Sequence, residues 1–77
     1  MANVVIYSTP TCVYCRMAKA YFAANNVAYT EKNVASDSAA REEMVKKSGQ
    51  LGVPVIDIDG EITVGFDEER LKGLLKI

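Results

Sequence analysis

The order of apolar and polar residues at the start of the chain predicts a strand followed by a helix. Residues 3–7 read Asn-Val-Val-Ile-Tyr, and three successive β-branched residues with an aromatic residue favour a strand buried on both faces. Pro10 cannot donate to a sheet, and Thr11 is a favourable helix N-cap. From residue 12 to about residue 25, apolar residues recur at helical spacing. The buried face expected for this helix consists of Val13, Met17, Ala20, Tyr21 and Ala24, widened by Phe22.

The next segment predicts a second strand and a second helix. Residues 28–34 alternate and favour a strand, which completes a strand-helix-strand unit with two parallel strands and a right-handed crossover. Residues 36–48 favour a helix, with Ser36 or Ser38 as its N-cap and Gly49 as its C-terminal stop.

The last third of the chain predicts a hairpin and a final helix. Residues 55–58 and 61–64 are short strand patterns joined by Asp-Gly, which favours a type I′ turn. Residues 67–76 favour a helix capped by Asp67, with its leucines facing inward. The order β-α-β-α-β-β-α predicts an α/β fold with a mixed four-stranded sheet flanked by three helices, in a single domain over residues 1–77.

Composition and charge narrow the function. The chain has 77 residues, a net charge of −1 and scattered basic residues, which argues against a nucleic-acid-binding protein. No apolar run is long enough to span a membrane, and the sequence shows no targeting segment. The expected compartment is therefore the cytoplasm, where two closely spaced cysteines are usually redox-active or metal-binding.

The two cysteines, Cys12 and Cys15, carry the strongest chemical signal. They lie three positions apart at the predicted start of a helix, on one face and within reach of a disulfide. The free N–H groups and positive dipole of a helix N-terminus stabilise a thiolate, which favours Cys12 as the nucleophile. Cys15, one turn further, is expected to be less exposed and to resolve the mixed disulfide formed by Cys12.

Three other readings of this pair remain open. The pair could form a structural disulfide, although its loop is too short to restrain the unfolded chain much. The cysteines could also be inert buried thiols. A metal or cluster could be shared between two chains, but within one chain no third cysteine and no histidine is available to complete a site. The position of the pair after a strand, in a strand-helix-strand unit, favours the redox reading.

Three segments of the chain resemble glutaredoxins, proteins of the thioredoxin fold. Residues 12–15, Cys-Val-Tyr-Cys, differ at one position from the Cys-Pro-Tyr-Cys of dithiol glutaredoxins. Residues 52–54, Gly-Val-Pro, resemble the Thr-Val-Pro segment whose proline is cis. Residues 64–67, Val-Gly-Phe-Asp, resemble the Gly-Gly-x-Asp segment before the last helix. The resemblance covers essentially the whole chain.

The resemblance implies a thiol-disulfide oxidoreductase that reduces protein disulfides or glutathione mixed disulfides. Glutathione would be a co-substrate, with no tightly bound cofactor and no metal. Tyr14 would border the reactive sulfur, and the backbone of Val53, before a cis Pro54, would pair with the cysteinyl part of glutathione. The implied glutathione-binding residues are Thr9, Tyr14, Val53, Pro54, Gly65, Phe66 and Asp67.

The start of the last helix has a role of its own in this resemblance. The N–H groups of Phe66 and Asp67 would hold the γ-glutamyl carboxylate, and Asp67 would face the amine. From the residues alone, Pro54 would be read as an ordinary trans proline, Gly65 as a turn residue and Phe66 as a packing residue.

Two departures from the glutaredoxin pattern favour alternatives. Thr9 occupies a position that is basic in many glutaredoxins, and Gly65-Phe66 resembles the Ser-Gly-Phe segment of NrdH-type redoxins. Such redoxins take electrons from thioredoxin reductase and can donate them to ribonucleotide reductase. A further alternative is a dimer that shares an iron-sulfur cluster through Cys12 and glutathione.

Overall fold

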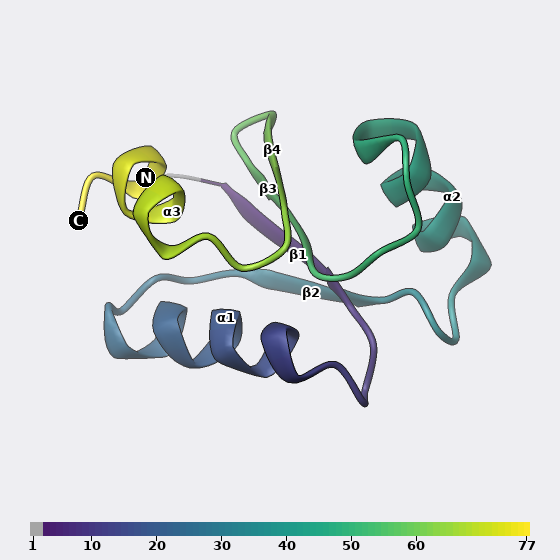
Figure 1. The fold of residues 1–77 in the computed structure, drawn as a ribbon, viewed down its shortest axis with the longest axis horizontal. Helices are drawn as coiled ribbons and strands as arrows, with labels where there is room; N and C mark the ends of the chain where they lie inside the picture. The colour runs from purple at the N-terminus through teal and green to yellow at the C-terminus, as the bar shows by residue number, and fades with distance from the viewer. Residues whose placement is uncertain (1–2) are drawn as a thin grey trace.

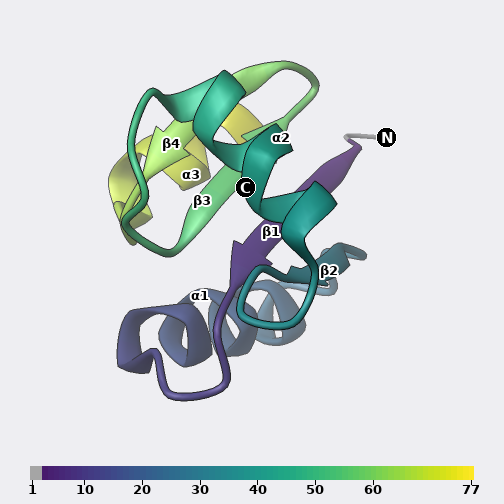
Figure 2. The same cartoon turned by 90° about the vertical axis from the view of Figure 1, so that its right-hand side faces the viewer.

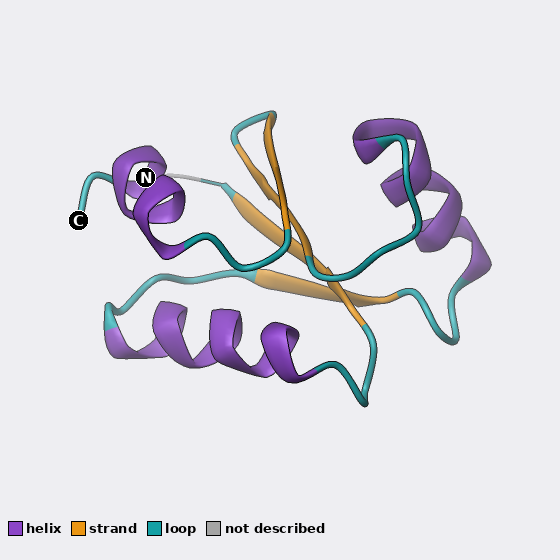
Figure 3. Cartoon of the chain, viewed as in Figure 1, coloured by secondary structure: helices purple, strands orange, loops and turns teal. Residues whose placement is uncertain are grey.

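The computed structural model describes residues 3–77, and these residues form seven elements in the predicted order. The elements are β1 (Val4–Ser8), α1 (Val13–Ala24), β2 (Thr30–Asn33), α2 (Ser38–Ser48), β3 (Val55–Ile58), β4 (Glu61–Val64) and α3 (Glu68–Leu75). The strands form a mixed sheet in the order β2-β1-β3-β4 (Figure 1). β1 is parallel to β2 and antiparallel to β3, and β4 is antiparallel to β3. The predicted four-stranded sheet with three helices is confirmed (Figure 3).

The core lies on both faces of the sheet. Helices α1 and α3 cover one face, and α2 covers the other (Figure 2). Alternate residues of β1 and β3 point to opposite faces, so each strand contributes to both layers. Ile6 and Ile56 belong to the α1–α3 layer, whereas Tyr7 and Val55 belong to the α2 layer. The prediction that the first strand is buried on both faces is therefore confirmed.

The predicted buried face of α1 is confirmed at Phe22 and in part at Tyr21, and is wrong at its other positions. The residues that α1 buries are Cys15, Ala18 and Phe22, whereas Val13 is 63% exposed and Met17 is 44% exposed. Both stripes have helical spacing, so periodicity alone cannot choose between them. The packed stripe presents a thiol and a methyl group near the start of the helix and a large ring further on.

Two predicted N-caps are also wrong. Cys12, not Thr11, caps α1, because the Cys12 sulfur accepts a hydrogen bond from the Cys15 N–H. Asp37 caps α2 in place of Ser36 or Ser38, because its carboxylate accepts from the Ala40 N–H at 3.1 Å. In both cases a neighbouring acceptor satisfies a free N–H at the helix start.

The predicted turn and stop signals agree with the backbone. Gly49 ends α2 with a φ of 74°, in the left-handed region that favours glycine. Asp59 and Gly60 both have positive φ, as a type I′ turn requires. The second strand is shorter than the predicted residues 28–34, because β2 pairs with β1 only from the level of Val5 to that of Ser8.

A polar cluster fixes α2 to the sheet. The hydroxyl of the fully buried Tyr7 donates to Glu43, and Lys47 Nζ donates to the same hydroxyl at 3.0 Å. Lys47 also binds Asp57 Oδ2 at 2.7 Å, and Lys32 binds Glu43 at 3.0 Å. These contacts lower the pKa of Glu43 from 4.5 to about 2, first through the Tyr7 hydrogen bond and then through Lys32.

This cluster predicts a pH dependence of stability. Because folding lowers the pKa of Glu43, the contribution of its carboxylate is present above pH 4.5 and is lost as the pH falls towards 2. We expect the urea midpoint to fall over this range, and to fall less in Glu43→Gln. The difference will be modest, since the side chain is 40% exposed and water screens its ion pairs. Glu42→Gln on the same helix is the matched control, and equal flattening in both variants would contradict the assignment.

Candidate functional site

The three segments singled out in the sequence meet at one end of the sheet. β1 runs towards Cys12, and its antiparallel neighbour β3 therefore begins at the same end. The register pairs Tyr7 with Val55, and Val55 with Val64, across the three strands. The loops that adjoin these paired residues are 9–12, 52–54 and 65–67. The topology thus brings together residues that are more than fifty positions apart.

Cys12 lies at the N-terminus of α1. Its backbone is extended, with φ of −83° and ψ of 114°, and its N–H donates to the Thr9 carbonyl at 3.3 Å. The half-buried sulfur lies 3.1 Å from the Cys15 nitrogen, which donates to it. A backbone N–H and the positive end of the helix dipole therefore both favour negative charge on this sulfur.

Cys15 has the opposite environment. It is fully buried, and this burial is the main reason that its pKa rises to about 12. The neighbouring Cys12 sulfur raises the pKa further, whereas the Thr9 backbone and the Lys19 ammonium oppose the rise. Both cysteines are free thiols in this structure. The pair thus combines a partly accessible sulfur at a helix N-terminus with a buried, protonated thiol.

The loop before β3 is linked to the loop before α3. The Val53–Pro54 peptide bond is cis, as the resemblance implied, and Pro54 is buried. Its carbonyl accepts from the Gly65 N–H at 2.8 Å. Gly65 has a φ of +83°, a conformation that side chains other than glycine rarely adopt. The turn reading of Gly65 is therefore correct.

Phe66 and Asp67 begin the α3 region. The Phe66 ring packs edge-on against Tyr21, with centroids 5.9 Å apart, so this side chain is a packing residue. Asp67 caps α3, as predicted, by accepting from the Arg70 N–H at 3.2 Å. Within residues 3–77, neither the Phe66 N–H nor the Asp67 N–H has a hydrogen-bond acceptor. Two donors at a helix start are thus free to bind an anion.

The remaining predicted site residues lie around the Cys12 loop or beside Pro54. Tyr14, in the first turn of α1, is 60% exposed. Thr9 is half-buried and uses its carbonyl to hold Cys12. Val53 packs partly against the α2 layer. Val13 and Met17, which the helical spacing had assigned to the core, are exposed apolar side chains on the same helix as the thiols.

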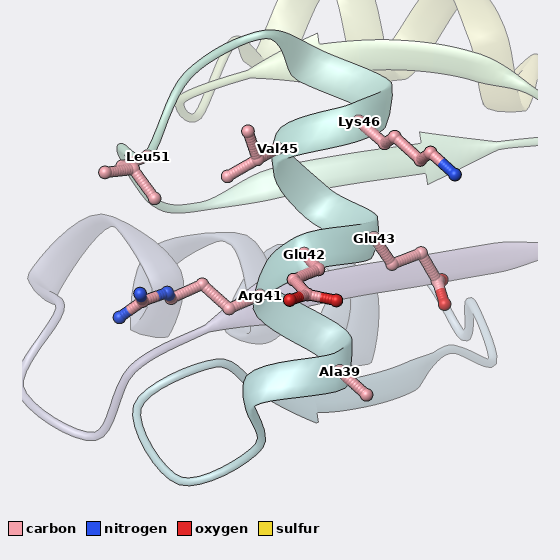
Figure 4. A pocket seen from close by; sticks show the side chains of 7 residues that line it. All are labelled: Ala39, Arg41, Glu42, Glu43, Val45, Lys46 and Leu51. Carbon is pink, nitrogen blue, oxygen red and sulfur yellow. The ribbon is translucent and has the colours of Figure 1, made fainter.

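A hollow of about 640 Å³ on α2 is separate from this group. It is lined by Ala39, Arg41, Glu42, Glu43, Val45, Lys46 and Leu51 (Figure 4). None of the predicted site residues lines it.

In residues 3–77 there is no group of three or more histidine, cysteine or acidic side chains placed to hold a metal ion. No helix in the same residues is long and apolar enough to cross a membrane.

The mixed sheet with a Cys-x-x-Cys pair at the start of its first helix defines the class as thioredoxin-fold proteins. The glutaredoxin family model matches residues 4–63, and the chain belongs to the glutaredoxin family. The family and the fold make it a thiol-disulfide oxidoreductase of the glutaredoxin type.

Individual relatives agree with this assignment. The chain is 48% identical to a glutaredoxin-like 8.6 kDa protein of the rubredoxin operon of Clostridium pasteurianum, over 92% of this chain and 95% of that protein. It is 44% identical to glutaredoxin 3 of Escherichia coli, over 88% of this chain and 82% of that protein.

Solved structures show the same fold. A thioredoxin-like protein superposes with a TM-score of 0.88 and 36% identity, over 94% of this chain and 99% of that one. A buckwheat glutaredoxin solved in complex with glutathione gives a TM-score of 0.78 and 25% identity, over 97% of this chain and 74% of that one.

Proposed function

We propose that the protein is a dithiol glutaredoxin that takes its electrons from glutathione, with Cys12 as nucleophile and Cys15 as resolving thiol. The observation that carries the proposal is the grouping of Cys12, cis Pro54 and two free N–H groups at one end of the sheet. The fold shared with the buckwheat glutaredoxin, whose structure is a glutathione complex, supports the same partner.

The grouping offers a complementary contact for most parts of glutathione. The N–H groups of Phe66 and Asp67 would bind the γ-glutamyl carboxylate, and the Asp67 carboxylate would pair with the amine. The Val53 backbone would pair with the cysteinyl part, beside Pro54 and Tyr14. At the glycine end, Thr9 would offer a hydroxyl in place of a cation. Glutathione would act as a co-substrate that binds and leaves, with no tightly bound cofactor.

The proposed reaction transfers two electrons through the pair. The Cys12 thiolate attacks one sulfur of a substrate disulfide, forms a mixed disulfide and releases the other substrate sulfur as a thiolate. Cys15 then gives up its proton, attacks the Cys12 sulfur and releases the second substrate thiol, which leaves a Cys12–Cys15 disulfide. Two glutathione molecules reduce this disulfide and are oxidised to glutathione disulfide.

An NrdH-like role is the second candidate. Two observations favour it: Thr9 stands in place of a cation, and the Gly65-Phe66 pair resembles the NrdH segment. The Phe66 ring packs on Tyr21. In this role thioredoxin reductase would supply the electrons, and a protein such as ribonucleotide reductase would receive them.

A side-by-side coupled assay distinguishes the two donors. We expect a glutathione mixed disulfide to be reduced at the expense of NADPH when glutathione and glutathione reductase are supplied. Thioredoxin reductase alone should support little turnover. Turnover with thioredoxin reductase and none with glutathione would overturn the proposal in favour of the NrdH-like role.

The variant Asp67→Asn tests in the same assay whether the charge of Asp67 contributes to glutathione binding. Asparagine is as good an N-cap as aspartate, so α3 should be retained while the charge that would face the glutathione amine is lost. We expect a KM for glutathione up to about fivefold higher, the upper end of what an exposed ion pair contributes. Glu68→Gln, the adjacent exposed acid, is the matched control and should leave KM unchanged.

A further inference from the structure

Arg70, in the first turn of α3, reaches back to the edge strand β4. Its Nε donates to Thr63 Oγ1 at 2.9 Å, and its Nη2 donates to the Ile62 carbonyl at 3.2 Å. Thr63 is only 3% exposed, so this hydroxyl is an acceptor with a fixed position. The planar guanidinium thus joins the strand before the Gly65–Asp67 segment to the helix after it.

The other end of the same segment is fixed as well. The Gly65 N–H donates to the Pro54 carbonyl at 2.8 Å, which ties the segment to the loop beside the thiols. Asp67 Oδ1 accepts from the backbone N–H of Arg70 itself. The free N–H groups of Phe66 and Asp67 therefore lie between two fixed contacts. One is the hydrogen bond from Gly65 to Pro54, and the other is the binding of the Arg70 side chain to β4.

We infer that Arg70 is a positioning residue for glutathione. By holding the first turn of α3 against Thr63, it keeps the Phe66 and Asp67 N–H groups in the arrangement that a carboxylate requires. This inference rests on the proposed use of glutathione. Arg70 acts on recognition and not on the sulfur chemistry, because its side chain contacts Glu61, Ile62 and Thr63 of β4 and neither cysteine.

If residues 65–67 are already ordered in the free protein, the entropic cost of binding glutathione is smaller. If the guanidinium is removed, the segment must be ordered each time glutathione binds, so the effect appears in KM. We expect Arg70→Met to raise the KM for glutathione roughly fivefold to tenfold, the effect of one or two hydrogen bonds. The kcat and the alkylation rate of Cys12 should stay within twofold of the wild-type values.

The matched control is Lys72→Met on the same helix, which removes the same charge from an exposed side chain that has no hydrogen-bond partner within residues 3–77. It should change neither KM nor kcat. Thr63→Val provides a second variant that keeps the shape of the buried side chain but removes the acceptor. Thr63→Ser keeps the hydroxyl and should restore most of the wild-type KM.

A second readout does not depend on glutathione. NMR order parameters of the free, reduced protein should fall for residues 65–67 in Arg70→Met and Thr63→Val, and should not fall in Lys72→Met. A purely structural role would lower the melting temperature without this local change and without a selective rise in KM.

The outcomes separate the inference from the proposed function. Wild-type turnover with glutathione and an unchanged KM in both Arg70→Met and Thr63→Val would overturn the positioning role and leave the function intact. An equal rise in KM in Lys72→Met would also overturn it, since charge alone would then be responsible. Absence of glutathione turnover in the wild-type protein would overturn the proposed function, and this inference with it.

Discussion

Replacing Cys12 with serine is expected to abolish disulfide reduction with either electron donor. The attacking species is a thiolate, and a serine hydroxyl does not ionise near neutral pH. Cys15 cannot take over, because it is fully buried, and this burial also raises the pKa of its thiol. We therefore expect a loss of at least about a thousandfold in the rate of disulfide reduction.

The control for Cys12→Ser is a measurement showing that the variant is still folded. Serine is one of the best N-cap residues, so it can accept the N–H of residue 15 as the Cys12 sulfur does, and the melting temperature should change little. Mass spectrometry after brief iodoacetamide treatment supplies the second check. The native wild-type protein should gain one adduct, at Cys12, and native Cys12→Ser should gain none. Rapid alkylation of Cys15 in the folded variant would contradict the assignment of the two thiols.

The elements of the fold could be predicted because their signals are local. The Asp59-Gly60 turn needs positive φ at two positions, and few residues other than these tolerate that conformation. The strand β1 is buried on both faces, which its β-branched run indicates directly. Signals of this kind depend on neighbours in the chain, so no knowledge of the tertiary structure is needed to interpret them.

The packing of most of α1 could not be predicted, because its apolar residues form two adjacent stripes, both at helical spacing. Val13 and Met17 belong to the stripe that remains exposed, and the choice is made by contacts with the sheet. The Tyr7–Glu43 and Arg70–Thr63 contacts were missed for a related reason. They join side chains on different elements, and neither pair has a sequence pattern.

In the candidate site, too, some features could be predicted from the sequence, whereas others depend on the tertiary structure. The two cysteines were found from their spacing, and cis Pro54 from the resemblance. The link between Pro54 and Gly65 depends on the register of β1, β3 and β4, which sequence periodicity does not specify. Asp67 as the cap of α3 was accessible from the sequence, whereas the absence of acceptors for the Phe66 and Asp67 N–H groups is known only from the structure.

Replacing Cys15 with serine should separate two activities. Cys12 can still attack a protein disulfide, but no neighbouring thiol can then resolve the mixed disulfide, so the complex should accumulate. On non-reducing gels we expect a covalent adduct with a protein substrate, together with a loss of multiple turnover. Reduction of a glutathione mixed disulfide should persist, because free glutathione can attack the Cys12–glutathione intermediate in place of Cys15.

Cys15→Ala is the matched variant, because position 15 is fully buried and a change there can disturb packing. If the missing thiol alone is responsible, Ser and Ala should give the same trapped adduct and the same retained glutathione activity, even if their melting temperatures differ. Loss of glutathione activity in both variants, equal to that of Cys12→Ser under saturating glutathione, would overturn the division of roles. The two sulfurs would then act only as a pair, and the environments of Cys12 and Cys15 would not assign their order of attack.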